Sequence, residues 1–369
     1  MIAAFDSAAP LAIQAIVDTL RTRASYPTSH VGIYLRRAVP RAIVHSGTRA
    51  PTRIDFGGGW TDVPPYSERE GGFVCNLAIA RYATVLLAPA DSSDNASLSA
   101  DRVRDQPLVE AAVRRAGIRG ADVALYNDFP VGAGLGGSSA AGVALADSLS
   151  RCAGEVLDPA ALAERSRATE VEELGIAGGR QDHYASAFGG ALALRFSDRG
   201  TNVHSIPLTR EAREELERRC IVVYTGESRV SGDTITAVTS AYERRDTKVL
   251  FALRRMKELA EGMARALECA DIDELAALVG EHWAHQRSLH PAIPTNRIDA
   301  IIERARAAGA LGAKALGASG GGCVLLIARR GNEEAVASVA SALGPLLPFA
   351  IAERGVETFV ADAVDLRQL

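Results

Sequence analysis

The chain has 369 residues, of which 47% are hydrophobic and 23% charged, and its formal net charge is −4. These values are ordinary for a globular protein, and the negative charge argues against a nucleic-acid binder, whose surface would be basic. The length exceeds what one hydrophobic core usually supports, so we expect two lobes.

The N-terminus and the cysteines bear on the compartment. The first residues, MIAAFDSAAPLAIQAIV, carry an acidic residue where a signal peptide needs positive charge, and no apolar run reaches the ~20 residues of a membrane span. The cysteines Cys75, Cys152, Cys220, Cys269 and Cys323 show no C-x-x-C spacing and read as reduced thiols in apolar surroundings. We therefore expect a cytoplasmic protein with no membrane or nucleic-acid partner.

Residues 1–45 form an N-terminal extension in which PLAIQAIVDTLRTRA predicts one amphipathic helix. This extension could pack on the body or mediate self-association, so a homodimer is one expectation. The highly charged segment PLTREAREELERR predicts a boundary between an N-terminal domain over residues 46–215 and a C-terminal domain over residues 216–369. Hairpin-like strands mixed with clustered helices predict an α+β fold with two lobes.

In the first of these domains, alternating residues predict strands in TRIDF and FVCNLAIARYATVLLA, on either side of a glycine- and proline-rich loop with an exposed Trp60. A strand over residues 122–129 leads into the glycine-rich segment PVGAGLGGSSAAG and then into a helix ending at Gly154. The next helix has Asp158 as its N-cap and Gly175 just past its end. A short glycine loop, IAGGRQDHYASAFGG, and the strand ALALRF follow.

The second domain begins with a strand in CIVVYTG, and a second glycine loop, KALGASGGGC, feeds a later strand. The predicted helices lie near residues 234–245, 247–268, 271–289, 296–309 and 332–343, with a closing strand near residues 348–360.

The segment PVGAGLGGSSAAG matches G-x-G-x-x-G, the fingerprint of a dinucleotide site, through Gly132, Gly134 and Gly137. That fingerprint also needs a following strand with an acidic residue about 20 positions on, and the chain there is predicted to be helical. The Gly-Lys-Ser/Thr of a Walker-A loop does not occur. A glycine turn before a helix is an anion site, and the hydroxyls of Ser138 and Ser139 favour a nucleoside triphosphate with Mg²⁺. The alternative is a plain glycine turn.

Several carboxylates could serve the same chemistry. Glu170 and Glu172 lie late on a helix, and Asp182 follows in a glycine loop. Metal-dependent phosphoryl transfer needs one carboxylate for Mg²⁺ and often a second to orient or deprotonate the attacking hydroxyl. A solvated helix face and a turn residue are the alternatives for these acids. In TRIDFGGGWTD, Asp62 with Thr61 suits the paired hydroxyls of a sugar, with an Asp-containing turn as the alternative.

Two further stretches stand out near the C-terminal end. GASGGGC, residues 317–323, has four glycines in seven residues and permits very close backbone approach. HWAHQRSLH offers His282, His285 and His290, but no cysteine supports their spacing, so we interpret them as residues of a helix surface rather than as a metal site.

The two glycine loops together resemble the galactokinase, homoserine kinase, mevalonate kinase and phosphomevalonate kinase (GHMP) superfamily. APTRIDFGGGWTDVPPYSEREGG, GGRQDHYASAFGG and HWAHQRSLHPAIPTNRIDAI resemble more narrowly its heptose kinases, which phosphorylate a heptose 7-phosphate at the anomeric carbon. The resemblance covers about residues 47–366. It implies an N-terminal lobe like the second domain of ribosomal protein S5, a ferredoxin-like C-terminal lobe, and ATP between them.

The resemblance also implies site roles. Asp182 would accept or orient the proton of the attacking hydroxyl, Arg53 would hold that carboxylate ionised, and Ser138 with Glu170 would bind Mg²⁺. The ATP phosphates would be bound by Gly132, Gly134, Leu135, Gly136, Gly137, Ser138 and Ser139. The sugar would be bound by Thr61, Asp62, Gly58, Gly59, Arg229, Gly320 and Gly321.

Two positions depart from the superfamily pattern, since Gly137 stands where a serine is usual and Ser319 where a small apolar residue or glycine is usual. The implied function is an ATP- and Mg²⁺-dependent kinase acting on the anomeric hydroxyl of a sugar phosphate such as a heptose 7-phosphate. A free-sugar 1-kinase of the L-fucokinase type and a dinucleotide-dependent oxidoreductase are the alternatives.

Overall fold

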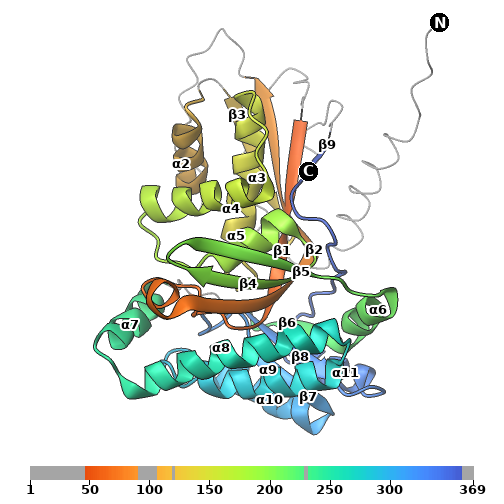
Figure 1. The fold of residues 1–369 in the computed structure, drawn as a ribbon. Coiled ribbons are helices and arrows are strands. Elements are labelled where there is room, and N and C mark those ends of the chain that lie inside the picture. Colours follow the sequence, from red (N-terminus) through yellow and green to blue (C-terminus); the bar gives the residue numbers. More distant parts are fainter. Residues whose placement is uncertain (1–45, 90–105, 119–120, 228–231, 360–369) are drawn as a thin grey trace, which may run out of the picture.

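The computed structural model describes residues 46–89, 106–118, 121–227 and 232–359. The predicted N-terminal helix and Arg229 therefore lie outside the described residues. Within the described part, the strands form two antiparallel sheets, each covered by helices, as the α+β prediction requires (Figure 1).

The first sheet has the strand order β5-β4-β2-β1-β9, and β3 also pairs with β2. Its long central strand, β2, pairs with β4 through residues 72–77 and with β3 through residues 83–89. The strands are β1 (Ser46–Gly57), β2 (Gly72–Pro89), β3 (Ala121–Asn127), β4 (Ala191–Ser197), β5 (Gly200–Ile206) and β9 (Glu357–Phe359).

Helices α2 (Gln106–Ala116), α3 (Gly137–Cys152), α4 (Pro159–Ala168) and α5 (Gln181–Phe188) accompany this sheet. Helix α3 packs on β1 and β2 on one side and on α2 and α4 on the other, and all its residues from Ser139 to Ser150 are buried. Small residues make this possible, because alanine, glycine and serine let neighbouring elements approach closely. A short π-helical segment, η3 (Thr169–Glu173), extends α4, and another, η2 (Ser67–Gly71), precedes β2.

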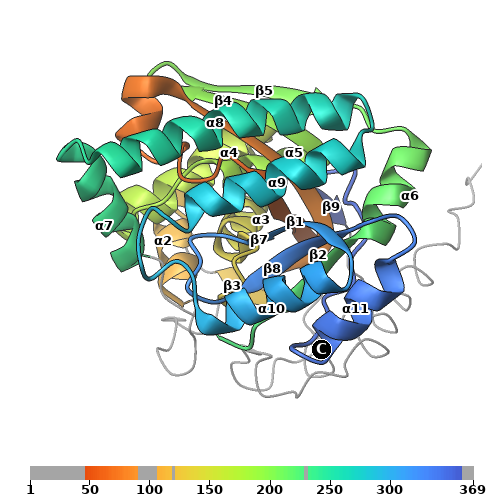
Figure 2. The same cartoon turned by 90° about the horizontal axis from the view of Figure 1, so that it is seen from below.

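The second sheet has the order β6-β8-β7, and all six residues of its central strand are buried. Helices α8 and α9 pack together, and α8 also packs on β1 and β2 while α9 packs on β7, so the pair lies between the two sheets (Figure 2). The strands are β6 (Cys220–Tyr224), β7 (Ala310–Ala315) and β8 (Cys323–Ala328), and the helices of this half are α6 (Arg210–Arg219), α7 (Gly232–Glu243), α8 (Thr247–Glu268), α9 (Ile272–Gln286), α10 (Asn296–Ala307) and α11 (Glu333–Ser341).

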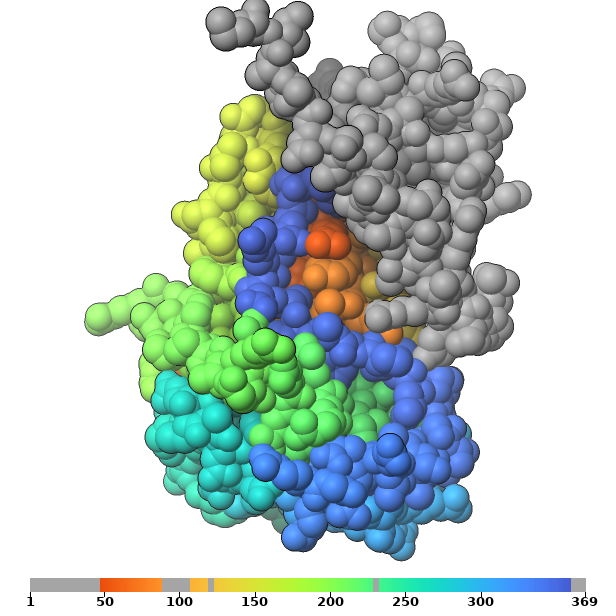
Figure 3. Space-filling model, turned by 90° about the vertical axis from the view of Figure 1, so that its right-hand side faces the viewer, coloured from red at the N-terminus to blue at the C-terminus, as the bar shows by residue number. Residues whose placement is uncertain are grey.

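The C-terminal segment returns to the first sheet, and Figure 3 shows it rising beside the red and orange atoms of β1 and β2. The N–H of Ala80 donates to the carbonyl of Ala350 (2.7 Å), and that of Ala352 donates to Ala78 (3.0 Å). The predicted closing strand over residues 348–360 is wrong in length, because only β9 forms a ladder there. The last strand thus belongs to the N-terminal sheet, although its residues fall in the range predicted for the C-terminal domain.

Several other expectations are settled by the fold. Asp158 is the N-cap of α4, since its carboxylate accepts the N–H of Ala161 at 2.8 Å. Trp60 is only 8% exposed, so its predicted exposure is wrong. Cys152 and Cys269 are exposed free thiols, which corrects their predicted apolar surroundings. In the described part of the chain, no helix is both long and apolar enough to cross a membrane.

Candidate active site

The first glycine loop has a regular backbone that suits an anion. Gly132, Gly134 and Gly136 have φ values of 74°, 73° and 74°, so every second residue is left-handed. Alternation of this kind turns successive N–H groups towards one centre. Helix α3 begins at the next residue, and its first N–H groups have no acceptor within the helix. Loop and helix end together therefore form an anion cradle of the kind that binds phosphates.

The second glycine loop packs against the first, backbone on backbone. A Cβ added to Gly134 would lie 2.7 Å from the carbonyl oxygen of Leu316, and one added to Gly322 would lie 2.8 Å from that of Ala133. The N–H of Cys323 donates to Ala133 at 2.8 Å. The glycines of GASGGGC are thus needed for this close approach, and the two loops support one another across the two halves of the chain.

The two departures from the superfamily pattern have local causes. A Cβ at Gly137 would lie 2.3 Å from the ring of Phe129, which fills the space of a larger residue. Ser319 has a positive φ of 67°, and its hydroxyl oxygen lies 3.0 Å from the Gln286 side-chain amide, which donates to it. The same amide donates to the carbonyl of Gly317 at 3.1 Å, so Gln286 fixes the second loop.

Asp182 and Arg53 meet at the first glycine loop. The Arg53 Nε and Nη2 atoms lie 2.7 and 2.6 Å from Asp182 Oδ1, and Nη1 donates to the Gly134 carbonyl at 2.6 Å. A Cβ on Gly136 would lie 3.1 Å from Asp182 Cγ, so the carboxylate faces the loop directly. Asp182 lies in the first turn of α5, not in a glycine loop as predicted, and this helix holds it rigidly.

Ser138 and Glu170 also come together, although they are 32 residues apart in sequence. The Ser138 hydroxyl donates to Glu170 Oε1 at 2.5 Å. Burial alone would raise the pKa of Glu170, but hydrogen bonds and charge from His183, with hydrogen bonds from Ser138 and Ser139, lower it overall. An ionised carboxylate beside an exposed hydroxyl is an all-oxygen donor set, which fits Mg²⁺ and its preference for few protein ligands.

Asp62 is a second acidic residue near Asp182, and it is buried. It is 2% exposed, and its Oδ2 accepts the N–H of Gln181 at 3.0 Å. Burial raises the pKa of Asp62 to about 6, helped by repulsion from Asp182 and Asp55 and opposed by the Gln181 hydrogen bond. At neutral pH the group is mostly ionised and is a strong acceptor for hydroxyl donors.

Three of the predicted sugar contacts, Thr61, Gly58 and Gly320, have polar groups that are hydrogen-bonded within the protein. The Thr61 hydroxyl is completely buried, donates to the Gly58 carbonyl at 2.7 Å and accepts the Phe73 N–H at 3.1 Å. The Gly58 N–H donates to His282 Nε2 at 2.9 Å, and the Gly320 N–H donates to the Ile293 carbonyl at 2.8 Å. These residues shape the loops around the site, because their polar groups are already engaged.

The remaining glycines lie at close contacts. A Cβ on Gly59 would lie 2.5 Å from Asp55 Oδ2, and one on Gly321 would lie 2.7 Å from the Glu227 carbonyl. The side chain of Leu135 is in the core, while its carbonyl accepts the Arg53 N–H at 3.0 Å.

Sequence reasoning missed a buried ionic pair behind the site. Lys314 Nζ lies 2.9 Å from Asp55 Oδ2, and both side chains are almost fully buried. The sequence did mark Lys314 as unusual, because it is one of only three lysines and lies in an apolar segment. His282 lies beside this pair and is completely buried, so its predicted place on a helix surface is wrong. Burial, with the charge of Lys314, lowers the pKa of His282, which keeps it neutral and able to accept the Gly58 N–H.

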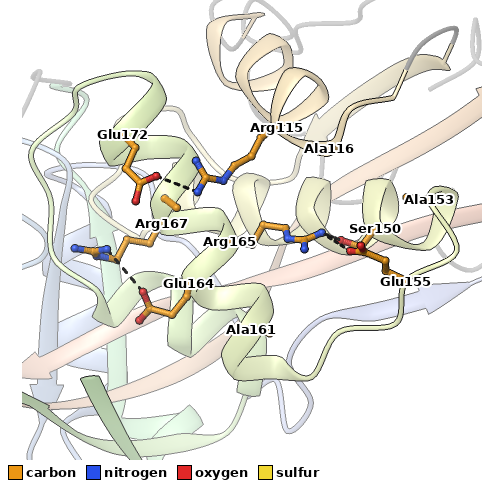
Figure 4. A pocket seen from close by; sticks show the side chains of 11 residues that line it. Arg115, Ala116, Ser150, Ala153, Glu155, Ala161, Glu164, Arg165, Arg167 and Glu172 are labelled. Carbon is orange, nitrogen blue, oxygen red and sulfur yellow. Dashed lines mark hydrogen bonds and ion pairs between the residues drawn. The ribbon is translucent and has the colours of Figure 1, made fainter. Parts of the chain in front are cut away.

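A cavity of about 670 Å³ opens elsewhere, between α2, α3, α4 and η3 (Figure 4). Its three arginines are compensated: Arg115 lies 3.0 Å from Glu172, Arg165 lies 2.8 Å from Glu155, and Arg167 lies 3.7 Å from Glu164. Of the candidate carboxylates named from the sequence, Glu172 lines this cavity, but Glu170 and Asp182 do not. We therefore place the chemistry at the glycine loops and not here.

Comparison with known proteins agrees with this geometry. Models of the GHMP kinases N terminal domain and of the GHMP kinases C terminal match residues 106–190 and 256–346, which contain the two glycine loops. The chain belongs to the GHMP kinase family. Its α+β, two-lobed fold is therefore the GHMP kinase fold, as the sequence resemblance implied, and family membership removes the dinucleotide alternative.

Among the relatives of this GHMP kinase is the D-glycero-alpha-D-manno-heptose 7-phosphate kinase of Campylobacter jejuni, 28% identical over 74% of this chain and 87% of the relative. The bifunctional fucokinase/GDP-fucose pyrophosphorylase of Arabidopsis thaliana is 27% identical over 76% of this chain, which spans only 29% of that protein. A D-glycero-D-manno-heptose 1-phosphate kinase structure from Bacteroides thetaiotaomicron has a TM-score of 0.68 at 23% identity, covering 86% of this chain and 99% of that one.

Proposed function

We propose that this GHMP kinase transfers the γ-phosphate of ATP to the anomeric hydroxyl of a sugar phosphate, with a heptose 7-phosphate or a similar long-chain sugar phosphate as the acceptor. The observation that carries the proposal is the position of Asp182, which Arg53 holds against the phosphate loop at Gly136. A carboxylate at that place can reach a hydroxyl poised to attack the terminal phosphate.

In this mechanism Asp182 orients the attacking hydroxyl and accepts its proton as the new O–P bond forms and ADP leaves. Arg53 holds the Asp182 carboxylate in place through its ion pair and neutralises part of the transferred charge. Positioning and electrostatics supply most of the acceleration in phosphoryl transfer, so the chain has little covalent work to do. The buried guanidinium, 4% exposed and bonded to the loop, suits this fixed role.

Ser138 and Glu170 would hold Mg²⁺, which when bound would neutralise charge on the phosphates. The N–H groups of the glycine loop and of the first turn of α3 would bind the phosphate oxygens. The donor set supports this part of the proposal, because both side chains offer oxygen and they already lie within hydrogen-bond distance.

The acceptor end of the site is rich in carboxylates. Asp182 faces the first glycine loop, and Asp62 is close enough to Asp182 for their charges to repel, while Asp55 behind Gly59 is paired with Lys314. Asp62 and Asp182 suit neutral hydroxyl donors better than a second phosphate at the reacting end of the sugar, so we place the phosphate of the acceptor at the far end. Arg229, outside the described residues, remains the predicted contact for that phosphate. A free-sugar 1-kinase is the second candidate, favoured by the fucokinase relative.

A coupled ADP-release screen tests the proposal, using six-, seven- and eight-carbon sugars, each with and without a terminal phosphate. We expect the largest kcat/KM with a seven-carbon sugar phosphate. Phosphorus NMR of the product then locates the new phosphate. A signal on a non-anomeric carbon would refute the 1-kinase assignment, and a preference for free sugars would favour the second candidate.

A further inference from the structure

His183 is a buried histidine beside the candidate metal ligand, and no part of the proposed function uses it. Its side chain is 2% exposed, and its Nε2 atom lies 3.1 Å from Glu170 Oε2. On the other side of the ring, Nδ1 lies 2.9 Å from the Ser166 hydroxyl. The imidazole thus connects helix α4, which carries Ser166, with the carboxylate of Glu170.

The direction of these hydrogen bonds follows from the groups involved. An ionised carboxylate can only accept hydrogen bonds. The His183 Nε2 atom therefore bears a hydrogen and donates a hydrogen bond to Glu170. The Nδ1 atom then accepts from the Ser166 hydroxyl in the neutral ring, or donates to it in the charged ring. Either way the donation to Glu170 is the same, so the arrangement does not depend on the protonation state of the ring.

The neighbouring residues are shaped to keep this arrangement. Glu170 Oε1 accepts from Ser138 and Oε2 faces His183, and the Ser139 hydroxyl, 3.4 Å from His183 Nε2, is a further neighbour of the carboxylate. Helix α3 carries Gly142 opposite Ser166, and a Cβ there would lie 2.3 Å from the Ser166 hydroxyl oxygen. The small residue lets Ser166 sit close enough to α3 to reach the imidazole.

We propose that His183, anchored by Ser166, is the positioning residue that fixes the Glu170 carboxylate for the Mg²⁺ of the nucleotide. This inference rests on the proposed function, because it assigns a support to the metal ligand named there. Partners that hold a ligating carboxylate typically change metal affinity by about 10–100-fold when removed. Without the hydrogen bond from His183, the Glu170 side chain would sample other rotamers, and Mg²⁺ would bind more weakly.

The test measures nucleotide dissociation constants in titrations with Mg²⁺ and in EDTA, which need no turnover. The variants are His183→Phe, which keeps the ring but has no donor, and His183→Gln, whose amide can still donate to Glu170. Tyr184→Phe is the matched control, since Tyr184 follows His183 on α5 and the substitution removes a part-buried hydrogen bond to Glu164 (2.8 Å) on α4.

For His183→Phe we expect the Mg²⁺ concentration at half-saturation to rise about 10–100-fold, with affinity in EDTA unchanged within about two-fold. His183→Gln should recover most of the loss, and Tyr184→Phe should leave the Mg²⁺ requirement unaltered. If His183→Phe does not fold, Ser166→Ala should show the same selective loss at about 3-fold or more.

Other outcomes overturn the inference. An unchanged Mg²⁺ requirement in these variants, or an equal loss of affinity in EDTA, would mean that His183 only supports the fold. Wild-type protein that binds nucleotide equally with and without Mg²⁺ would instead contradict the proposed function, and the inference with it. The wild-type titration therefore separates the two failures.

Discussion

Replacing Asp62 by asparagine should stabilise the folded protein at high pH and leave it nearly unchanged at low pH. The pKa of this carboxyl is raised from its ordinary value of 3.8 to about 6, chiefly by burial. Between these values the folded state holds a proton that the unfolded state has released, so the stability contributed by this group is lost as the pH rises through 6. The shift corresponds to about 3 kcal/mol. Above pH 7 the free energy of unfolding is lower by this full amount.

Asparagine keeps an acceptor for the Gln181 N–H but carries no charge, so the variant escapes this cost. Urea unfolding at pH 4.5 and pH 8 measures the effect. The free energy of unfolding of the variant relative to wild type should rise by about 2 kcal/mol from the lower pH to the higher. Effects that do not depend on pH cancel in that comparison. The variant should also bind the acceptor more weakly, because it loses an ionised acceptor for a sugar hydroxyl.

Asp147 provides a matched control with the opposite sign. It is equally buried at 2% exposure, but it accepts from the Arg151 guanidinium at 2.9 Å and from the Thr358 hydroxyl at 2.9 Å. Asp147→Asn should lose about 1–3 kcal/mol at pH 8, because it weakens charge-assisted hydrogen bonds. If Asp62→Asn shows the same pH dependence as wild type, the argument that burial leaves Asp62 insufficiently compensated is wrong.

Two further predictions concern the loops and the buried pair. Gly134 and Gly154 have φ values of 73° and 80°, but only Gly134 has a close neighbour, the Leu316 carbonyl. Both alanine substitutions should lower the free energy of unfolding by about 1–2 kcal/mol, because the backbone is left-handed at both positions. Gly134→Ala should also weaken nucleotide binding about ten-fold, because the added Cβ displaces the loop. Equal nucleotide affinity in the two variants would contradict this. Lys314→Met should lower the free energy of unfolding by about 3–5 kcal/mol, because it leaves the buried Asp55 charge without its partner. Adding Asp55→Asn should recover most of that loss, and additive losses in the double variant would refute the pairing.

The first glycine loop was predictable because its signals are local. A strand, alternating glycines and a helix start stand together in PVGAGLGGSSAAG, and each follows from backbone sterics. The same holds for the N-cap Asp158 and the long helices of the second half, whose apolar spacing is clear. Helix α5 was missed because it has only eight residues between glycine-rich segments, too few for a helical period to show.

The supports behind the site could not be predicted, because they depend on long-range packing. Asp55 and Lys314 are 259 residues apart, and nothing local tells either residue that it has a partner. His282 has the spacing of a surface histidine, yet the packing of α9 between α8 and β7 buries it, and its ring accepts the Gly58 N–H. His183 follows the catalytic candidate directly, but its role requires knowing that Glu170 and Ser166 lie on either side of its ring.

The proposed phosphoryl transfer depends most on Asp182, the carboxylate that acts on the attacking hydroxyl. Asp182→Asn should lower turnover by about 10²–10⁴-fold while nucleotide affinity stays within a few-fold of wild type, because the phosphate loop is left intact. Glu172→Gln, an exposed acid paired with Arg115, should alter neither quantity. Turnover of Asp182→Asn within a few-fold of wild type would contradict the proposed mechanism.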